Sequence, residues 1–304
     1  MTLRDGVKNL VEVAASSLGL VRVAARANRT AVAVLAYHNV VPAGQKPEGD
    51  LSLHMPEARF RRQLDAIQER HRIVSLDTLG EEGAADVAPR VAITFDDAYV
   101  GAVLTALPEL ARRGLPCTVF ISAGMMGRHS FWWDRLAGED GVVPPGARDH
   151  ALWRLGGDDE EVRAWMSSEG LKERDLPDHA RSATRGELAE AVASGLVTIA
   201  AHGWGHRNFA AAGDEHLDRE LQRPAESLSS DFEAYRPWLA YPYGLHTDRV
   251  ESAAAATYDL AFRVEGGLLR PGDVRGRART LPRINVPAGM SPRGLALRLA
   301  GVAA

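Results

Sequence analysis

The chain has 304 residues, of which 45% are hydrophobic and 25% charged, an ordinary composition for one large globular domain or one domain with an insertion. A formal net charge of −4 argues against a nucleic-acid partner, because nucleic-acid-binding proteins normally present a basic face. The single cysteine, Cys117, excludes an intrachain disulfide framework and a multi-cysteine zinc site.

The first 30 residues are predicted to form an N-terminal helical extension. Its apolar stretch is interrupted by Glu12 and Arg22, so we do not expect a secretory signal, and no apolar run reaches the length of a transmembrane segment. We therefore expect a cytoplasmic location, with peripheral contact to a membrane surface as the open alternative. The oligomeric state is not predicted.

Strand and helix patterns alternate between residues 31 and 290. Apolar runs predict buried strands at 32–36, 91–95, 117–121, 196–201 and 238–240. Helical spacing is found at 60–67, 104–111, 184–193 and 248–257, and the third of these helices begins with a capping-box pattern. This alternation predicts a parallel sheet covered by helices, either open or closed into a barrel.

Residues 128–182 break the alternation. The segment is rich in Trp, Asp, Glu, Gly and Pro and has helical character near 160–166. Long excursions of this kind are usually functional, so we expect a rim insertion that covers the site and sets the size of the substrate. Residues 291–304 are predicted to form a C-terminal helix.

Asp96 and Asp97 follow the predicted strand at 91–95, and α/β folds place their sites where strands end. Adjacent carboxylates point in different directions, so one can bind a metal while the other faces a water molecule. The alternative interpretation is an ordinary strand-end turn with a helix cap, where aspartate is favoured.

His202-Gly-Trp-Gly-His206 follows the strand at 196–201. Two histidines four residues apart can turn both rings toward one ion, although two unrelated loop histidines would give the same pattern. Two imidazoles and one carboxylate leave coordination positions open for water and substrate, which is typical of a catalytic metal site.

Three motifs now carry a family resemblance. Thr94-Phe-Asp-Asp97, the His202/His206 pair and Tyr241-Pro-Tyr-Gly244 resemble, in order, the first three motifs of the polysaccharide deacetylases with the NodB homology domain, a group like carbohydrate esterase family 4. The likeness runs from about residue 32 to 286, apart from the insertion. It implies an α/β fold, namely a distorted (β/α)7 barrel of the NodB type.

The resemblance also implies roles for individual residues. Asp97, His202 and His206 would bind a divalent metal, for which we expect zinc. Asp96 would be the general base, and the backbone N–H of Tyr243 would help to hold the oxyanion. A metal polarises the amide carbonyl and lowers the pKa of a bound water toward about 7, and a neighbouring carboxylate completes the deprotonation.

The sequence departs from the family pattern in three places. Ala240 stands where the third motif usually has arginine, and the fourth motif is not recognisable around residues 258–267. The family usually draws a catalytic histidine from a C-terminal element, but no histidine follows His246. The corresponding strand is expected at 281–286.

Other residues are expected to replace the missing groups. Tyr37-His38 resembles the N-terminal Tyr-His motif of the exopolysaccharide-modifying branch, so His38 is the predicted general acid; a structural histidine is the alternative, and His54 and His246 are weaker candidates. Arg283 or Arg236 could orient Asp96 by bidentate pairing. Four tryptophans are candidates either for stacking on a sugar or for packing: Trp132, Trp133, Trp204 and Trp238.

The predicted reaction is removal of an acetyl, or another acyl, group from an N-acylated amino sugar or polysaccharide. A small glycoside, a sugar nucleotide or a natural-product intermediate is the alternative substrate, because a rim insertion would close an open groove. A homologue that binds carbohydrate without hydrolysing it is the non-enzymatic alternative. Retention of both aspartates and both histidines argues against it.

Overall fold

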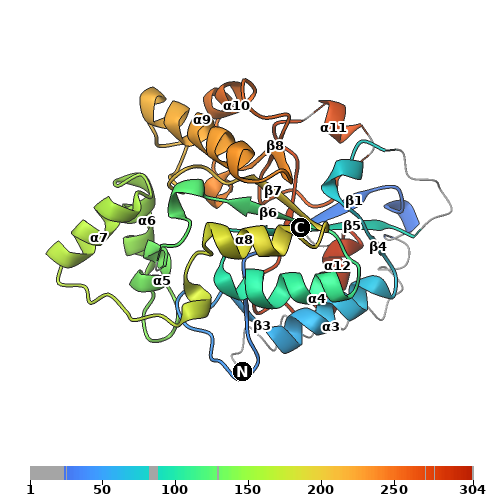
Figure 1. Ribbon diagram of the computed structural model, residues 1–304, viewed down its shortest axis with the longest axis horizontal. Coiled ribbons are helices and arrows are strands. Elements are labelled where there is room, and N and C mark those ends of the chain that lie inside the picture. Colours follow the sequence, from blue (N-terminus) through green and yellow to red (C-terminus); the bar gives the residue numbers. More distant parts are fainter. Residues whose placement is uncertain are drawn as a thin grey trace.

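A curled parallel sheet forms the centre of the computed structural model, which describes residues 24, 26–81, 88–128, 130–270, 272–276 and 278–302 (Figure 1). The main sheet contains β1 (Val32–Tyr37), β4 (Arg72–Ile73), β5 (Arg90–Asp96), β6 (Cys117–Ile121), β7 (Val197–Ala201), β8 (Tyr235–Ala240), β9 (Leu260–Phe262) and β10 (Ile284–Asn285). A separate pair consists of β2 (Asn39–Val41) and β3 (His54–Pro56).

The main sheet follows the order β10-β1-β5-β6-β7-β8-β9, with β4 paired to β5 off this path. Every pair of neighbouring strands is parallel. A parallel bridge between Phe262 and Leu281 links β9 to the segment that leads into β10, and so brings the two ends of the path together. The predicted distorted (β/α) barrel is therefore confirmed.

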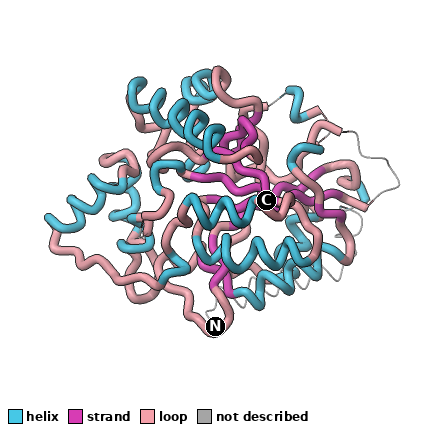
Figure 2. Tube along the Cα trace, in the orientation of Figure 1, coloured by secondary structure: helices cyan, strands magenta, loops and turns pink. Residues whose placement is uncertain are grey.

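Helices surround the strands, as Figure 2 shows. Those that connect or flank the strands are α3 (Glu57–Gln68), α4 (Leu107–Arg112), α8 (Arg185–Val192), α9 (Asp214–Asp231), α10 (Asp248–Ala254), α11 (Asp273–Gly276) and α12 (Pro292–Leu299). Three further helices lie together at one end of the molecule, at the left of Figure 1: α5 (Trp132–Leu136), α6 (Pro145–Trp153) and α7 (Asp159–Ser168).

Side chains of the strands alternate between two apolar clusters, as the period of two requires. Along β1, Ala33, Leu35 and Tyr37 belong to the larger cluster, which the helices cover. Val32 and Val34 belong to a smaller cluster on the other face, together with small or aromatic residues of β5, β6, β7 and β8. Because both faces are buried, β1 and β6 read as nearly continuous apolar runs.

The predicted rim insertion, residues 128–182, contains α5, α6 and α7, and α7 spans the stretch with expected helical character. Within the predicted C-terminal segment 291–304, α12 spans Pro292–Leu299. The predicted N-terminal extension, residues 1–30, lies almost entirely outside the described residues. None of the helices within the described ranges is both long and apolar enough to span a membrane.

Candidate metal centre and active site

The predicted site residues follow the carboxyl ends of parallel strands. His38 comes directly after β1, Asp96 ends β5, His202 comes directly after β7, and Tyr243 lies three residues after β8. The carboxyl ends of parallel strands meet at one end of a barrel, which brings these four segments together.

Asp97, His202 and His206 present one ligand atom each, and these atoms all lie within 4.8 Å of one another. Asp97 Oδ1 is 3.1 Å from His206 Nε2 and 3.7 Å from His202 Nε2. The two Nε2 atoms are 3.2 Å apart. All three side chains are buried. Two imidazole nitrogens and one carboxylate oxygen that converge in this way can hold one divalent ion and leave other coordination positions open.

The tautomer of His202 fits a ligand role. Its Nδ1 lies 2.7 Å from the carbonyl oxygen of Ala240, and a carbonyl can only accept, so Nδ1 carries the proton and the lone pair of Nε2 faces the cluster. Burial lowers the pKa of His202 to about 4, although the neighbouring charge of Asp96 opposes this shift. His202 is therefore neutral near pH 7, as metal coordination requires.

The backbone is strained at this site. Among the described residues, four non-glycine residues have positive φ: Asp97 (69°), Ala98 (52°), His206 (57°) and Tyr243 (59°). Each such conformation costs on the order of 1–3 kcal/mol and persists only where the surroundings impose it. Three of the four are predicted site residues, and Ala98 directly follows the aspartate pair. The fold thus concentrates its strain at the candidate active site.

Asp96 is held by a buried arginine. Arg283 Nη1 and Nη2 donate to Asp96 Oδ1 and Oδ2 at 2.7 and 2.8 Å, and Nη1 also donates to Thr94 Oγ1 at 3.1 Å. Arg236, the alternative partner, instead pairs with Asp77 at a half-exposed position. Of the two arginines considered from the sequence, Arg283 is therefore the one in bidentate contact with Asp96.

The charges around the two aspartates favour their ionised forms. Burial raises the pKa of Asp96, but Arg283 and then His202 outweigh it and bring the pKa well below its usual range. The pKa of Asp97 is also lowered, because His206 and His202 outweigh the effect of burial. His38 contributes to lowering the pKa of both aspartates, so it lies within electrostatic range of each.

Glu220 of α9 supports the loop that carries the histidines, and sequence reasoning did not identify it. Its carboxylate accepts hydrogen bonds from the backbone N–H groups of Trp204 and Gly205 at 2.9 Å each. A Cβ on Gly203 would lie 2.9 Å from Glu220 Oε2, so glycine permits this close approach. No local signal in the sequence links Glu220 to a loop 15 residues away.

Residues of the predicted insertion contact the candidate metal ligand His206. The ring of Trp133 lies 4.7 Å from that of His206, and Tyr243 packs edge-on against His206 at 4.5 Å. Trp132 Nε1 donates to the hydroxyl of Tyr243 at 3.1 Å. Trp132 and Trp133 are buried and serve as packing residues here, as does Trp238 in the smaller cluster. Trp204 is half-buried and has Arg223 over its ring.

The weaker histidine candidates have other partners. His54 was expected to have no strand behind it, and none leads into it: it is the first residue of β3, is buried, and lies 2.8 Å from Asp134 Oδ1. His246 pairs with Glu251 at 2.8 Å and stacks on Tyr241.

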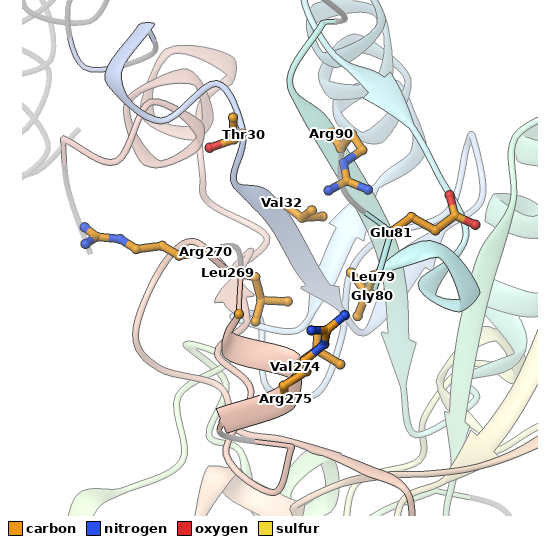
Figure 3. A pocket seen from close by; sticks show the side chains of 11 residues that line it. Thr30, Val32, Leu79, Gly80, Glu81, Arg90, Leu269, Arg270, Val274 and Arg275 are labelled. Atoms are coloured by element: carbon orange, nitrogen blue, oxygen red, sulfur yellow. The ribbon is translucent and has the colours of Figure 1, made fainter. Parts of the chain in front are cut away.

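A cavity of about 320 Å³ lies at the other end of the strands (Figure 3). It is lined by Val32, the first residue of β1, and by Arg90, the first residue of β5. None of the predicted site residues lines it. The candidate site at the carboxyl ends of the strands is therefore separate from this cavity.

The protein is an α/β barrel with its candidate site at the carboxyl ends of the strands. The family described as polysaccharide deacetylase matches residues 84–261, more than half of the chain. The chain therefore belongs to the polysaccharide deacetylase family, whose members are hydrolytic enzymes. This membership supports deacetylation of polysaccharide as its activity. No curated protein matches the chain in sequence.

Solved structures share the fold. IcaB from Ammonifex degensii is 21% identical, with a TM-score of 0.62 over 89% of this chain and 97% of that one. Streptococcus pyogenes deacetylase PplD, in complex with acetate, is 17% identical, with a TM-score of 0.61 over 88% and 98%. A de-N-acetylase from Aggregatibacter actinomycetemcomitans is 15% identical, with a TM-score of 0.61 over 88% and 99%.

Proposed function

We propose that this protein is a metal-dependent deacetylase that removes the acetyl group from N-acetylated amino sugars of a polysaccharide. The observation that carries the proposal is the convergence of Asp97, His202 and His206 beside an ionised Asp96, at the carboxyl end of the barrel. Asp97, His202 and His206 are the proposed ligands, with zinc as the expected ion. When bound, a divalent ion supplies Lewis-acid activation of the amide carbonyl and of the attacking water.

Asp96 is the proposed general base. It is ionised near neutral pH because Arg283 stabilises its charge. Each carboxylate oxygen offers two lone-pair sites, so each keeps one after Arg283 has bound. In this role Asp96 accepts a proton from the attacking water, and Arg283 fixes the orientation of the carboxylate.

His38 is the proposed general acid. Amide hydrolysis needs one, because an amine anion is too basic to leave unprotonated. His38 is half-buried and within electrostatic range of both aspartates, which is consistent with donation of a proton to the departing amine. The backbone N–H of Tyr243 is the proposed donor to the developing oxyanion; the positive φ of this residue is a further sign of functional strain.

A small glycoside or sugar nucleotide is the second candidate substrate. The packing of Trp133 against His206 favours it, because the insertion then borders the site and can limit the substrate's size. A cytoplasmic or membrane-peripheral location accords with such a substrate, and it remains a prediction.

The test combines metal analysis with a substrate comparison. Purified wild-type protein should contain about one equivalent of divalent metal and should release acetate from N-acetylglucosamine oligomers faster than from a sugar nucleotide. His206→Ala should lose metal and activity together, whereas His216→Ala, at an exposed histidine outside the cluster, should lose neither. Full metal occupancy in His206→Ala would overturn the ligand assignment. A wild type that binds metal but hydrolyses neither substrate would favour the carbohydrate-binding alternative.

A further inference from the structure

No hydrogen bond to Nδ1 orients the ring of His206. Its Nδ1 is buried and is among the described side-chain atoms that lack a hydrogen-bond partner. Histidines that bind metals are normally oriented by a hydrogen bond from the second ring nitrogen. Here aromatic rings surround His206 instead, with ring centroids of Tyr243 at 4.5 Å, Trp133 at 4.7 Å and Phe131 at 6.0 Å.

A hydrogen bond and a ring contact hold the side chain of Trp133 in place. Its Nε1 donates to the hydroxyl of Tyr99 at 2.8 Å, and Phe131 stacks on it at 4.5 Å with an interplanar angle of 10°. The Tyr99 hydroxyl in turn donates to Asp134 Oδ2 at 2.7 Å. Tyr99 thus links the indole that packs against His206 to a buried carboxylate.

Asp134 also receives hydrogen bonds from β3 and from the loop that precedes it. His54 Nε2 lies 2.8 Å from its Oδ1, and the backbone N–H of Asp50 donates to the same oxygen at 2.9 Å. The side chain of Asp134 is fully buried. Gly49, at φ +89°, lies so close that a Cβ there would be 2.5 Å from Asp134 Oδ1. The carboxylate therefore has almost no freedom to move, and this rigidity extends to Tyr99.

We propose that Tyr99 and Asp134 are positioning residues for the metal site. They hold Trp133 of the insertion against His206 and so fix the direction of its Nε2. The inference rests on the proposed function, because it presumes that His206 binds a metal. It gives the insertion a second role besides bordering the substrate: the insertion supplies the support that the unpaired Nδ1 of His206 does not provide.

The experiment removes one hydroxyl and measures metal binding. Tyr99→Phe keeps the ring but deletes the link between Trp133 and Asp134. Tyr258→Phe is the matched control, because Tyr258 is equally buried and its hydroxyl donates to the backbone oxygen of Leu221 at 2.6 Å, outside the Trp133–Tyr99–Asp134 chain of hydrogen bonds. Metal-free proteins are titrated with Zn²⁺ against a chromophoric chelator. Separately, the visible absorption of the Co²⁺-loaded proteins reports the ligand geometry.

We expect Tyr99→Phe to weaken Zn²⁺ binding by about 10–100-fold, the usual effect of losing an outer support of a ligand, and to change the Co²⁺ spectrum. Tyr258→Phe should match wild type in both. Trp133→Phe removes the same hydrogen bond from the other side. Combined with Tyr99→Phe, it should weaken binding little more than the stronger single variant, because both break one link.

Two results would overturn the inference: unchanged Zn²⁺ affinity and Co²⁺ spectrum in Tyr99→Phe, or equal weakening in Tyr99→Phe and Tyr258→Phe, which would indicate general destabilisation. Failure of the wild type itself to bind Zn²⁺ would overturn the proposed function, and with it the basis of this inference. The wild-type titration therefore separates the two failures.

Discussion

The pairing of Arg283 with Asp96 makes a prediction about stability that does not depend on the reaction. The two side chains are 0% and 2% exposed, so solvent hardly screens their interaction. Two charge-assisted hydrogen bonds, at 2.7 and 2.8 Å, contribute about 1.5–3 kcal/mol each. Removing one partner leaves the other charge buried, so Arg283→Met should lower the free energy of unfolding by about 3–5 kcal/mol.

A double-mutant cycle separates this ion pair from packing effects. Asp96→Asn should be destabilising because it leaves the buried guanidinium without its counter-charge. The double variant should then be more stable than the sum of the two losses predicts, by about 2–3 kcal/mol, since neither charge remains. Urea unfolding of metal-free protein measures all four corners, with unchanged m-values as the condition for the comparison.

Arg236→Met is the matched control. Arg236 pairs with Asp77, and both side chains are nearly half exposed, at 44% and 43%. Such a surface pair contributes at most about 1 kcal/mol. Strictly additive losses for Arg283→Met and Asp96→Asn, or a loss in Arg283→Met no greater than in Arg236→Met, would refute the reasoning.

Three further predictions address the reaction and the response to acid. Asp96→Asn should retain metal but lose about 10²–10⁴-fold in turnover; loss of metal instead would mean that the roles of the two aspartates are exchanged. His38→Ala should spare metal binding and slow amide hydrolysis more than ester hydrolysis. If the variant hydrolyses the amide as fast as the wild type, His38 is not the general acid. Hydrogen bonding by Arg112, opposed by burial and aided by Arg113, lowers the pKa of Glu109 from 4.5 to about 2. Ionised Glu109 therefore stabilises the folded protein above pH 4.5, and this contribution is lost as the pH falls toward 2. In urea unfolding, Glu109→Gln should be less stable than wild type at neutral pH, and the difference should shrink as the pH falls toward 2.

The regular elements of the barrel were largely predictable because their signals are local. The apolar run Cys117–Ile121 is β6 residue for residue. The pattern Thr184-Arg-Gly-Glu187 forms a complete capping box at the start of α8. In both cases the residues that specify the element lie within it or directly beside it, so no tertiary information was needed.

The longest helix in the described part of the chain, α9, was not predicted. Leu217, Leu221 and Leu228 of α9 have helical spacing, but Pro224 lies between them, and proline in a helix interior normally breaks or kinks the helix. In the structure Pro224 is among the buried residues of α9. Packing of this face against the barrel offsets the local penalty, a balance that residue propensities alone do not reveal.

The candidate site was only partly predictable, because some of its contacts are tertiary and leave no local signal. The two aspartates and the two histidines lie in short motifs at strand ends, so their spacing alone suggested a metal site. Glu220 reaches the site only through tertiary contacts. Tyr99 and Asp134 lie beside residues that the sequence singled out, Asp97 and Trp133, but the hydrogen bonds that join them are tertiary. Their identity alone therefore did not reveal a role.

The sheet order bears on two of the departures from the family pattern: the absence of arginine at position 240 and the absence of a C-terminal histidine. Arg283 directly precedes β10, and β10 pairs with β1, which pairs with β5. Arg283 thus lies in the segment where the resemblance predicts the family's C-terminal histidine, and its bidentate contact with Asp96 is the one proposed for a replacement of the arginine that Ala240 lacks. We infer that the acid then has to come from an adjacent strand end. β1 lies between β10 and β5, and the residue after β1 is His38, within electrostatic range of both aspartates. A chain with arginine introduced at position 240 should therefore tolerate loss of Arg283 better than the wild type does, as urea unfolding of both would measure.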